Sequence, residues 1–162
     1  MRELVRRRAK SYSAQRLDSL VNLDIIASTV LALSYSRRYP EASQPYIQYD
    51  CVAACMDGND LWVASNSKQI TDEDLDNLIS IMEKDHFIFT GDIYIVKNGK
   101  GHMHAEMQLL SELHSIGVLK PTTSYIGVSK PCCEKCKIVL DSMRIGYANW
   151  HSDPLGEWES PF

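Results

Sequence analysis

The stretch MHAEMQLLSELHSIGVLKPTTSYIGVSKPCCEKC, residues 103–136, contains the residues that decide the fold. Apolar residues at helical intervals predict a helix over about 103–115, which ends near Gly117. A strand is expected at 124–128, and Pro131 is expected to open a second helix that runs to about Arg144. Each of these two helices therefore begins with chemically reactive side chains.

The rest of the chain supplies further helices and strands around this stretch. In chain order, the expected elements are a helix at about 13–35, a hairpin with strands at 46–55 and 61–64 around the turn 57–60, a helix that follows Thr71, a strand at 93–97 and a last short strand at 147–150. Strands that alternate with helices in the C-terminal half indicate an α/β layered fold with parallel pairing there.

The composition is that of one folded domain. The chain has 162 residues, of which 44% are hydrophobic and 23% charged, so it can bury a core without a second domain. Its longest apolar stretch, 17–33, contains Asp18 and Asp24, which argues against a membrane span. The basic start does not resemble a secretory signal, and five cysteines are an odd number for a disulfide framework. We therefore expect a soluble protein without a signal peptide or transmembrane segment in this chain.

The charge is unevenly distributed along the chain. Eight basic and three acidic residues up to Pro40 leave a balance of +5, and since the whole chain carries -4, the remainder carries -9. A basic element on an acidic body can steer a polyanion. The alternative interpretation is a solvated helix face.

Two sequence patches predict a metal site. Cys133 and Cys136 are three residues apart at a helix start, so both sulfurs would point the same way and suit one ion. Zinc takes Cys sulfur and His nitrogen together, and His104 would be the third ligand. Three protein ligands leave one position open for water, as in catalytic sites. Glu106 would lie beside the ion and move protons to and from that water.

Several alternatives remain open at this point. His102 or Cys132 could complete four protein ligands, and the cysteine cluster alone would suit a structural zinc knuckle. Cys51 and Cys55 share one face of a strand and are interpreted as core residues. Trp150 would either stack on a base or close the edge of the sheet, and Trp158 is expected to pack the C-terminal tail against the body.

The motifs His104-Ala105-Glu106 and Pro131-Cys132-Cys133-Glu134-Lys135-Cys136 resemble those of the zinc-dependent cytidine and nucleobase deaminase superfamily. The resemblance covers about 46–150 and looks most like the deaminase domains of bacterial polymorphic toxins. It implies a three-layer α/β/α sandwich with a mixed sheet. Residues 46–150 would be the deaminase core, preceded by a basic, helical element at 1–40 and interrupted by an insertion at 67–101.

The resemblance also implies a reaction and roles for individual residues. Cytosine would be deaminated to uracil: zinc, held by His104 and the two cysteines, would activate a water for attack on C4, while Glu106 protonates N3 and then the departing ammonia. The backbone N–H of Ala105 would hold the base carbonyl, and Asn66 the sugar. The loop that contains Trp150, His151 and Asp153 would contact flanking nucleotides.

Three features depart from the superfamily pattern, one of which is the insertion at 67–101, longer than the usual connection between Asn66 and His104. Cys132 separates Pro131 from the first ligand cysteine, so Cys132 with Cys136 is an alternative pair, although its spacing is not that of the family. Only twelve residues follow Trp150, too few for a crossover helix and a fifth parallel strand. We expect the fifth strand to be antiparallel or absent.

Three functions follow from these observations: a nucleic-acid deaminase of toxin type, a deaminase of free cytidine or nucleotides, and a zinc-stabilised binding module without catalysis. For the first, single-stranded DNA is the preferred substrate, with RNA and duplex DNA as alternatives. A toxin domain would act as a monomer in the cytoplasm of the producing or target cell, and its partners would include a cognate immunity protein. No membrane partner is expected.

Overall fold

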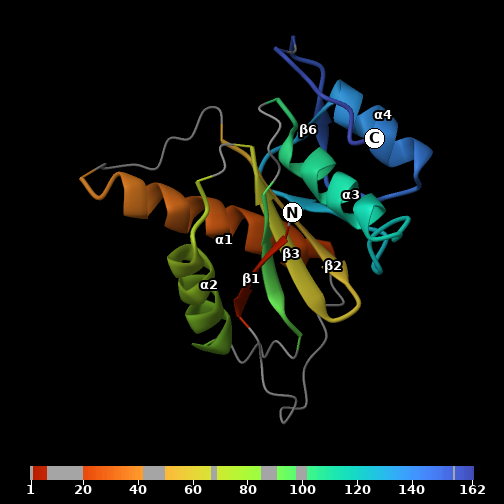
Figure 1. The fold of residues 1–162 in the computed structure, drawn as a ribbon. Helices are drawn as coiled ribbons and strands as arrows, with labels where there is room; N and C mark the ends of the chain where they lie inside the picture. Colours follow the sequence, from red (N-terminus) through yellow and green to blue (C-terminus); the bar gives the residue numbers. More distant parts are fainter. Residues whose placement is uncertain are drawn as a thin grey trace.

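The computed structural model describes residues 2–6, 20–41, 50–66, 69–84, 91–97, 102–154 and 156–162. Its strands are β1 (Arg2–Arg6), β2 (Val52–Asp57), β3 (Asp60–Ser65), β4 (Ile93–Val96), β5 (Gly127–Val128), β6 (Cys132–Cys133) and β7 (Trp150–His151). Its helices are α1 (Leu20–Arg38), α2 (Asp72–Lys84), α3 (Ala105–Ser115) and α4 (Glu134–Ser142). Figure 1 shows these elements on the ribbon.

The central sheet is mixed. Its strand order is β1-β4-β3-β2-β5. β2 pairs antiparallel with β3 and β5, whereas β3 and β4 are parallel, and β1 is antiparallel to β4. The turn between β2 and β3 places Gly58 at a φ of 61°, a conformation that glycine adopts without strain. The predicted hairpin is therefore present.

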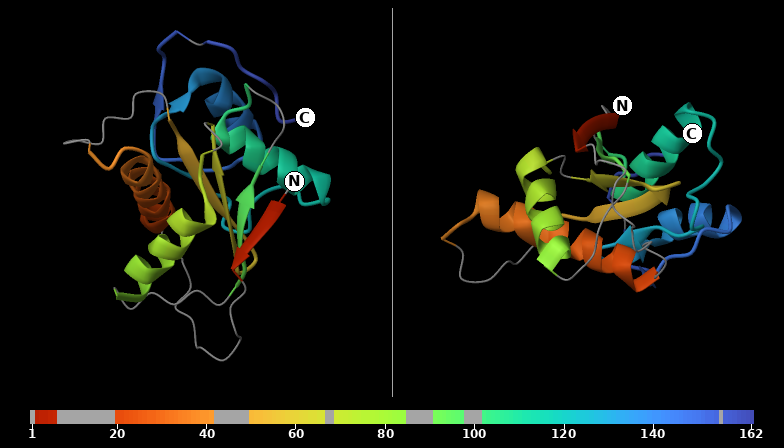
Figure 2. Two further views of the ribbon diagram at one scale, coloured as in Figure 1. Left: turned by 60° about the vertical axis from the view of Figure 1, so that its left-hand side comes forward. Right: turned by 90° about the horizontal axis from the view of Figure 1, so that it is seen from below.

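Helices cover both faces of this sheet. In Figure 2 (left), α1 and α2 lie on one side of the strands and α3 on the other. Residues of β2 contribute to the buried clusters on both faces of the sheet, because alternate side chains of a strand point to opposite faces. Ala54 and Met56 are buried with the first pair of helices, while Ala53 and Cys55 are buried with α3 and α4. The predicted three-layer α/β/α sandwich with a mixed sheet is confirmed.

Helix α1 is held tightly against β5. The Asp24 carboxylate accepts the Val128 N–H at 2.9 Å and the Tyr125 hydroxyl at 2.6 Å. The backbones meet at Gly127, where a Cβ atom would lie 2.2 Å from the carbonyl carbon of Leu23. Only a residue without a side chain fits this contact.

The segment expected as an insertion adds one strand to the sheet and one helix to a face. β4 lies beside β3, and α2 packs on α1. The buried Asp74 of α2 accepts hydrogen bonds from the Arg37 guanidinium at 2.9 and 3.1 Å and from the Thr71 N–H at 3.0 Å. Residues 67–68, 85–90 and 98–101 of this segment lie outside the described part.

Two local predictions differ from the structure. The N-terminal element was expected to be helical, but Arg2–Arg6 is a strand that pairs with β4, because β4 would otherwise be an unpaired edge. Pro131 does not open a helix: Cys132 and Cys133 are extended and pair with β7, and α4 begins at Glu134. The predicted parts at 13–19 and 46–49 lie outside the described residues.

The C-terminal end has no further strand after His151 in residues 152–154 and 156–162. This agrees with the expectation that the fifth strand is antiparallel or absent. Across the described ranges, no helix combines the length and the apolar character that crossing a bilayer requires.

Candidate metal centre and pocket

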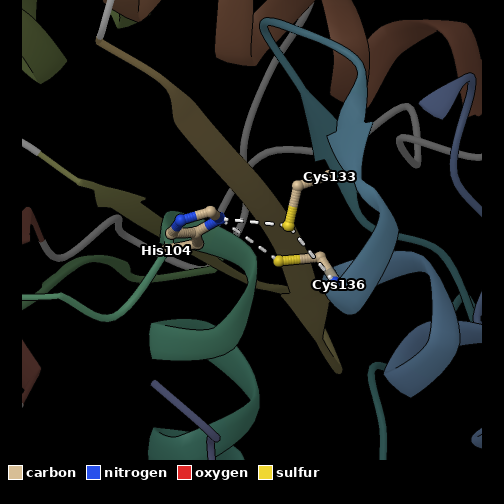
Figure 3. Close-up of side chains that lie close together, drawn as sticks. All are labelled: His104, Cys133 and Cys136. Carbon is tan, nitrogen blue, oxygen red and sulfur yellow. Dashed lines mark hydrogen bonds between the residues drawn. The ribbon is translucent and has the colours of Figure 1, made fainter. Parts of the chain in front are cut away.

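His104 lies at the start of α3. Its backbone is extended, with φ -62° and ψ 156°, and the helix continues from Ala105. The imidazole makes no capping hydrogen bond to its own helix. It points instead toward α4, where two sulfur atoms lie close to it (Figure 3).

Those sulfurs belong to Cys133 and Cys136. Cys133 is the N-cap residue of α4, and its Sγ accepts the Cys136 N–H at 3.4 Å. His104 Nδ1 lies 3.5 Å from Cys133 Sγ and 3.4 Å from Cys136 Sγ. The three ligand atoms all lie within 4.8 Å of one another. One nitrogen and two sulfurs in this arrangement could hold a metal ion, and they are the donors that zinc prefers.

Contacts within the trio favour the thiolate form of Cys133, whereas the hydrogen bond to Cys133 raises the pKa of the Cys136 thiol far above its usual range. The hydrogen bond from the Cys136 thiol, and then that from His104, hold the pKa of Cys133 well below its usual range. The hydrogen bond with Cys133 raises the pKa of His104. Thiolate is the form of cysteine that binds metals. The residues therefore fit a zinc ion.

Cys132 is not part of this group. It precedes Cys133 in β6, where consecutive side chains point to opposite faces, and its side chain is fully buried. Burial raises the pKa of the Cys132 thiol far above its usual range. The structure thus brings His104 together with Cys133 and Cys136, and not with the alternative pair.

Glu106, in the first turn of α3, is buried beside the three ligands. Its side chain is 2% exposed, and its Oε2 atom has no hydrogen-bond partner. Burial is the main cause that raises the pKa of this carboxyl group. A buried carboxylate oxygen without a partner is costly in a folded protein, so its presence beside a cavity indicates a functional site.

A cavity of about 440 Å³ opens beside this glutamate. This volume lies within the range of small-molecule sites. The cavity is lined by Cys51, Asn66, His104, Ala105, Glu106, Lys130, Pro131, Cys133, His151 and Asp153. Asn66 and Ala105, both expected to bind substrate, are therefore at the cavity.

Asn66 is fixed at the end of β3. Its Oδ1 accepts the Cys51 N–H at 2.7 Å, and its own N–H donates to the Cys51 carbonyl at 3.1 Å. Trp150 lies elsewhere: it is not among the lining residues, it is 41% exposed, and Lys137 Nζ is 5.0 Å from its ring centroid. His151, at the end of β7, and Asp153, in the loop that follows, line the cavity instead.

Two further residues contact the site: Gln108, which the sequence did not single out, and Trp158, which was expected only to pack the tail against the body. The buried Gln108 donates from Nε2 to the carbonyls of Ser65 and Met103, each at 3.0 Å, and so ties β3 to the residue before His104. Trp158 donates from Nε1 to Cys136 Sγ at 3.3 Å. Neither contact follows from sequence spacing, because both depend on how distant segments fold together.

Three residues that could hold a metal ion lie next to a buried glutamate, at the starts of two helices that share one face of a mixed sheet, and this is the arrangement typical of the cytidine deaminase-like class. Comparison with protein-family models agrees: residues 103–162 match the OTT_1508-like deaminase family. The matched region contains both motifs, so the predicted resemblance is confirmed and hydrolytic deamination is the indicated class of reaction. Neither the curated proteins nor the solved structures gave a match.

Proposed function

We propose that this protein deaminates cytosine to uracil within a nucleic acid. The observation that carries the proposal is the partnerless carboxylate oxygen of Glu106, buried beside His104, Cys133 and Cys136 at a cavity of about 440 Å³. Hydrolytic deamination needs a metal ligand set and a proton-transferring group at one place. These residues supply both.

In this proposal, His104, Cys133 and Cys136 hold a zinc ion. When bound, zinc supplies Lewis acidity that lowers the pKa of a water toward about 7. Glu106 would take one proton from the attacking water and give it to N3 of the base. It would then take the proton of the new C4 hydroxyl and give it to the amino group, which would leave as ammonia. Water thus provides the oxygen at C4, and the exocyclic nitrogen departs.

The chain's own residues orient the base. The Ala105 N–H lies at the free start of α3, where backbone donors have no partner within the helix, and would bind the base carbonyl. Asn66, fixed by Cys51, would bind the sugar. Lys130 lines the same cavity and adds a cation that suits a substrate with phosphates.

A substrate panel tests the proposal. The zinc-loaded protein would be incubated with single-stranded DNA, duplex DNA and RNA of one sequence and with free cytidine, and uracil would be scored by mass. We expect uracil to form fastest in single-stranded DNA. Faster conversion of free cytidine would favour the nucleoside deaminase, and a zinc-loaded protein that converts none of the four would contradict the proposal and favour a binding module.

A further inference from the structure

The C-terminal tail, residues 156–162, returns to the two helices of the metal centre. The chain end lies beside α3 and α4 in Figure 1. Phe162 packs edge-on against His114 of α3, with ring centroids 4.9 Å apart, and Pro161 is buried. Trp158 packs against the buried cluster that contains Cys133 and Cys136. The tail therefore has a defined path across this side of the molecule.

Within this tail, Trp158 contacts the sulfur of Cys136, one of the candidate metal ligands. Its indole N–H donates to Cys136 Sγ at 3.3 Å, and Lys135 Nζ lies 5.5 Å from its ring centroid. Indole nitrogen is a donor only, and a half-buried indole N–H normally finds an oxygen acceptor. Here the acceptor is one of the three candidate ligand atoms that lie within 4.8 Å of one another.

Each of the two sulfurs therefore accepts one hydrogen bond from an N–H group. Cys133 Sγ accepts an N–H from the Cys136 backbone, which the start of α4 provides by itself. Cys136 Sγ accepts its N–H from Trp158, 22 positions further along the chain. Groups that hydrogen-bond metal ligands fix their orientation and tune their charge. Two thiolates neutralise a divalent cation, and an N–H donor on each sulfur withdraws part of that charge.

We propose that Trp158 is a positioning residue of the metal centre, whose indole N–H fixes the Cys136 sulfur and lowers its electron donation to the ion. The inference rests on the metal site of the proposed function. It also assigns a role to the tail, which couples the C-terminus of the chain to the electronic state of that site.

Replacing zinc with cobalt(II) makes the electron donation of the sulfur measurable. The energy of the sulfur-to-cobalt charge-transfer band falls as the sulfur donates electrons more strongly. Trp158→Phe keeps an aromatic ring and removes the N–H. The band should move to longer wavelength, and affinity for the ion should fall by about 10-fold, the usual size for such outer contacts. Trp150→Phe is the matched control, because Trp150 contacts no ligand residue among the described contacts, and its band should match the wild type.

Replacing Trp158 with benzothienylalanine, which has the shape of tryptophan but sulfur in place of the N–H, separates the hydrogen bond from packing. It should give the same band shift as phenylalanine. A wild-type band in both variants, or an equal shift in Trp150→Phe, would overturn the inference while leaving the metal site and the reaction intact. A wild-type protein that binds neither cobalt nor zinc would overturn the metal site and this inference together.

Discussion

Glu106 and His104 are two residues apart, yet their side chains lie in different surroundings. His104 faces the two sulfurs, whereas the Glu106 carboxylate is buried beside the cavity with one oxygen unpaired. A group in this position can move protons without holding the ion. We therefore expect replacement of His104 to impair metal binding, and replacement of Glu106 to impair deamination without loss of the metal.

Glu106→Gln should bind zinc as the wild type does and lose deamination by about 10²- to 10⁴-fold, the usual contribution of a general acid–base group. Glutamine fills the same space, so the fold should be retained. Zinc content by elemental analysis and uracil formation by mass check the two expectations. Near-normal turnover in this variant would contradict the assigned role.

The neighbouring cysteines offer a matched pair of substitutions. Cys133→Ser should abolish stoichiometric zinc binding, because it removes one of three ligand atoms that lie within 4.8 Å of one another. Cys132→Ser should keep the metal, because the Cys132 sulfur is not one of these three atoms and contacts the Glu106 carboxyl group instead. Elemental analysis of the two purified variants distinguishes them. Zinc loss only in Cys132→Ser would mean that the ligand pair is wrong.

At the level of elements, the contact between α1 and β5 positions the strand that leads to the cysteine helix. Asp24 binds β5 through Val128 and also holds Tyr125, and burial is the main cause that raises the pKa of the Tyr125 hydroxyl. The backbone of Leu23 lies against Gly127. A side chain at this glycine would push the helix from the sheet.

Gly127→Ala should therefore lower the free energy of unfolding by about 3 kcal/mol, the upper part of the range for overpacked cores, because its Cβ would meet backbone rather than a movable side chain. Gly156→Ala is the control: no atom lies within 4 Å of its Cβ, and its effect should stay within about 0.5 kcal/mol. Urea unfolding followed by circular dichroism measures both. Equal stability of the two variants would contradict the close packing of α1 on β5.

At the scale of the whole molecule, the proposed function predicts that substrate choice depends on surfaces outside the cavity. Trp150 is exposed in β7, directly before the cavity residue His151, so a base next to the target could stack on it. The basic run Arg6–Arg8 would add phosphate contacts that weaken as salt rises. The side chains of this run lie outside the described residues, so this role stays a prediction.

Trp150→Ala should lower turnover on polymer, or change the preferred flanking base, without altering the salt dependence. Replacing Arg6, Arg7 and Arg8 with glutamine should flatten the plot of log affinity against log salt by about 0.7 for each lost contact to a single strand, with base preference unchanged. Turnover and binding at several salt concentrations separate the two effects. If neither change matters and free cytidine reacts as fast as polymer, the nucleic-acid proposal is wrong.

The sequence by itself determined the class of fold and the components of the site. Regular apolar spacing predicted α1, the hairpin of β2 and β3, α2 and α3, since these elements are long enough for local patterns to dominate. The motifs at 104–106 and 131–136 specified which side chains would form a metal site, because the spacing within each motif is local, whereas the meeting of the two motifs depends on the fold. His104, Cys133 and Cys136 come together as those motifs predict.

Tertiary structure alone decided the features that depend on distant neighbours. Arg2–Arg6 is a strand because β4 offers it an edge, and Cys132 and Cys133 are extended because β7 pairs with them, which delays α4 until Glu134. Trp158 reaches Cys136 only through the path of the tail. Such contacts join segments far apart in the chain, and their energy arises from pairing and burial that no local pattern encodes.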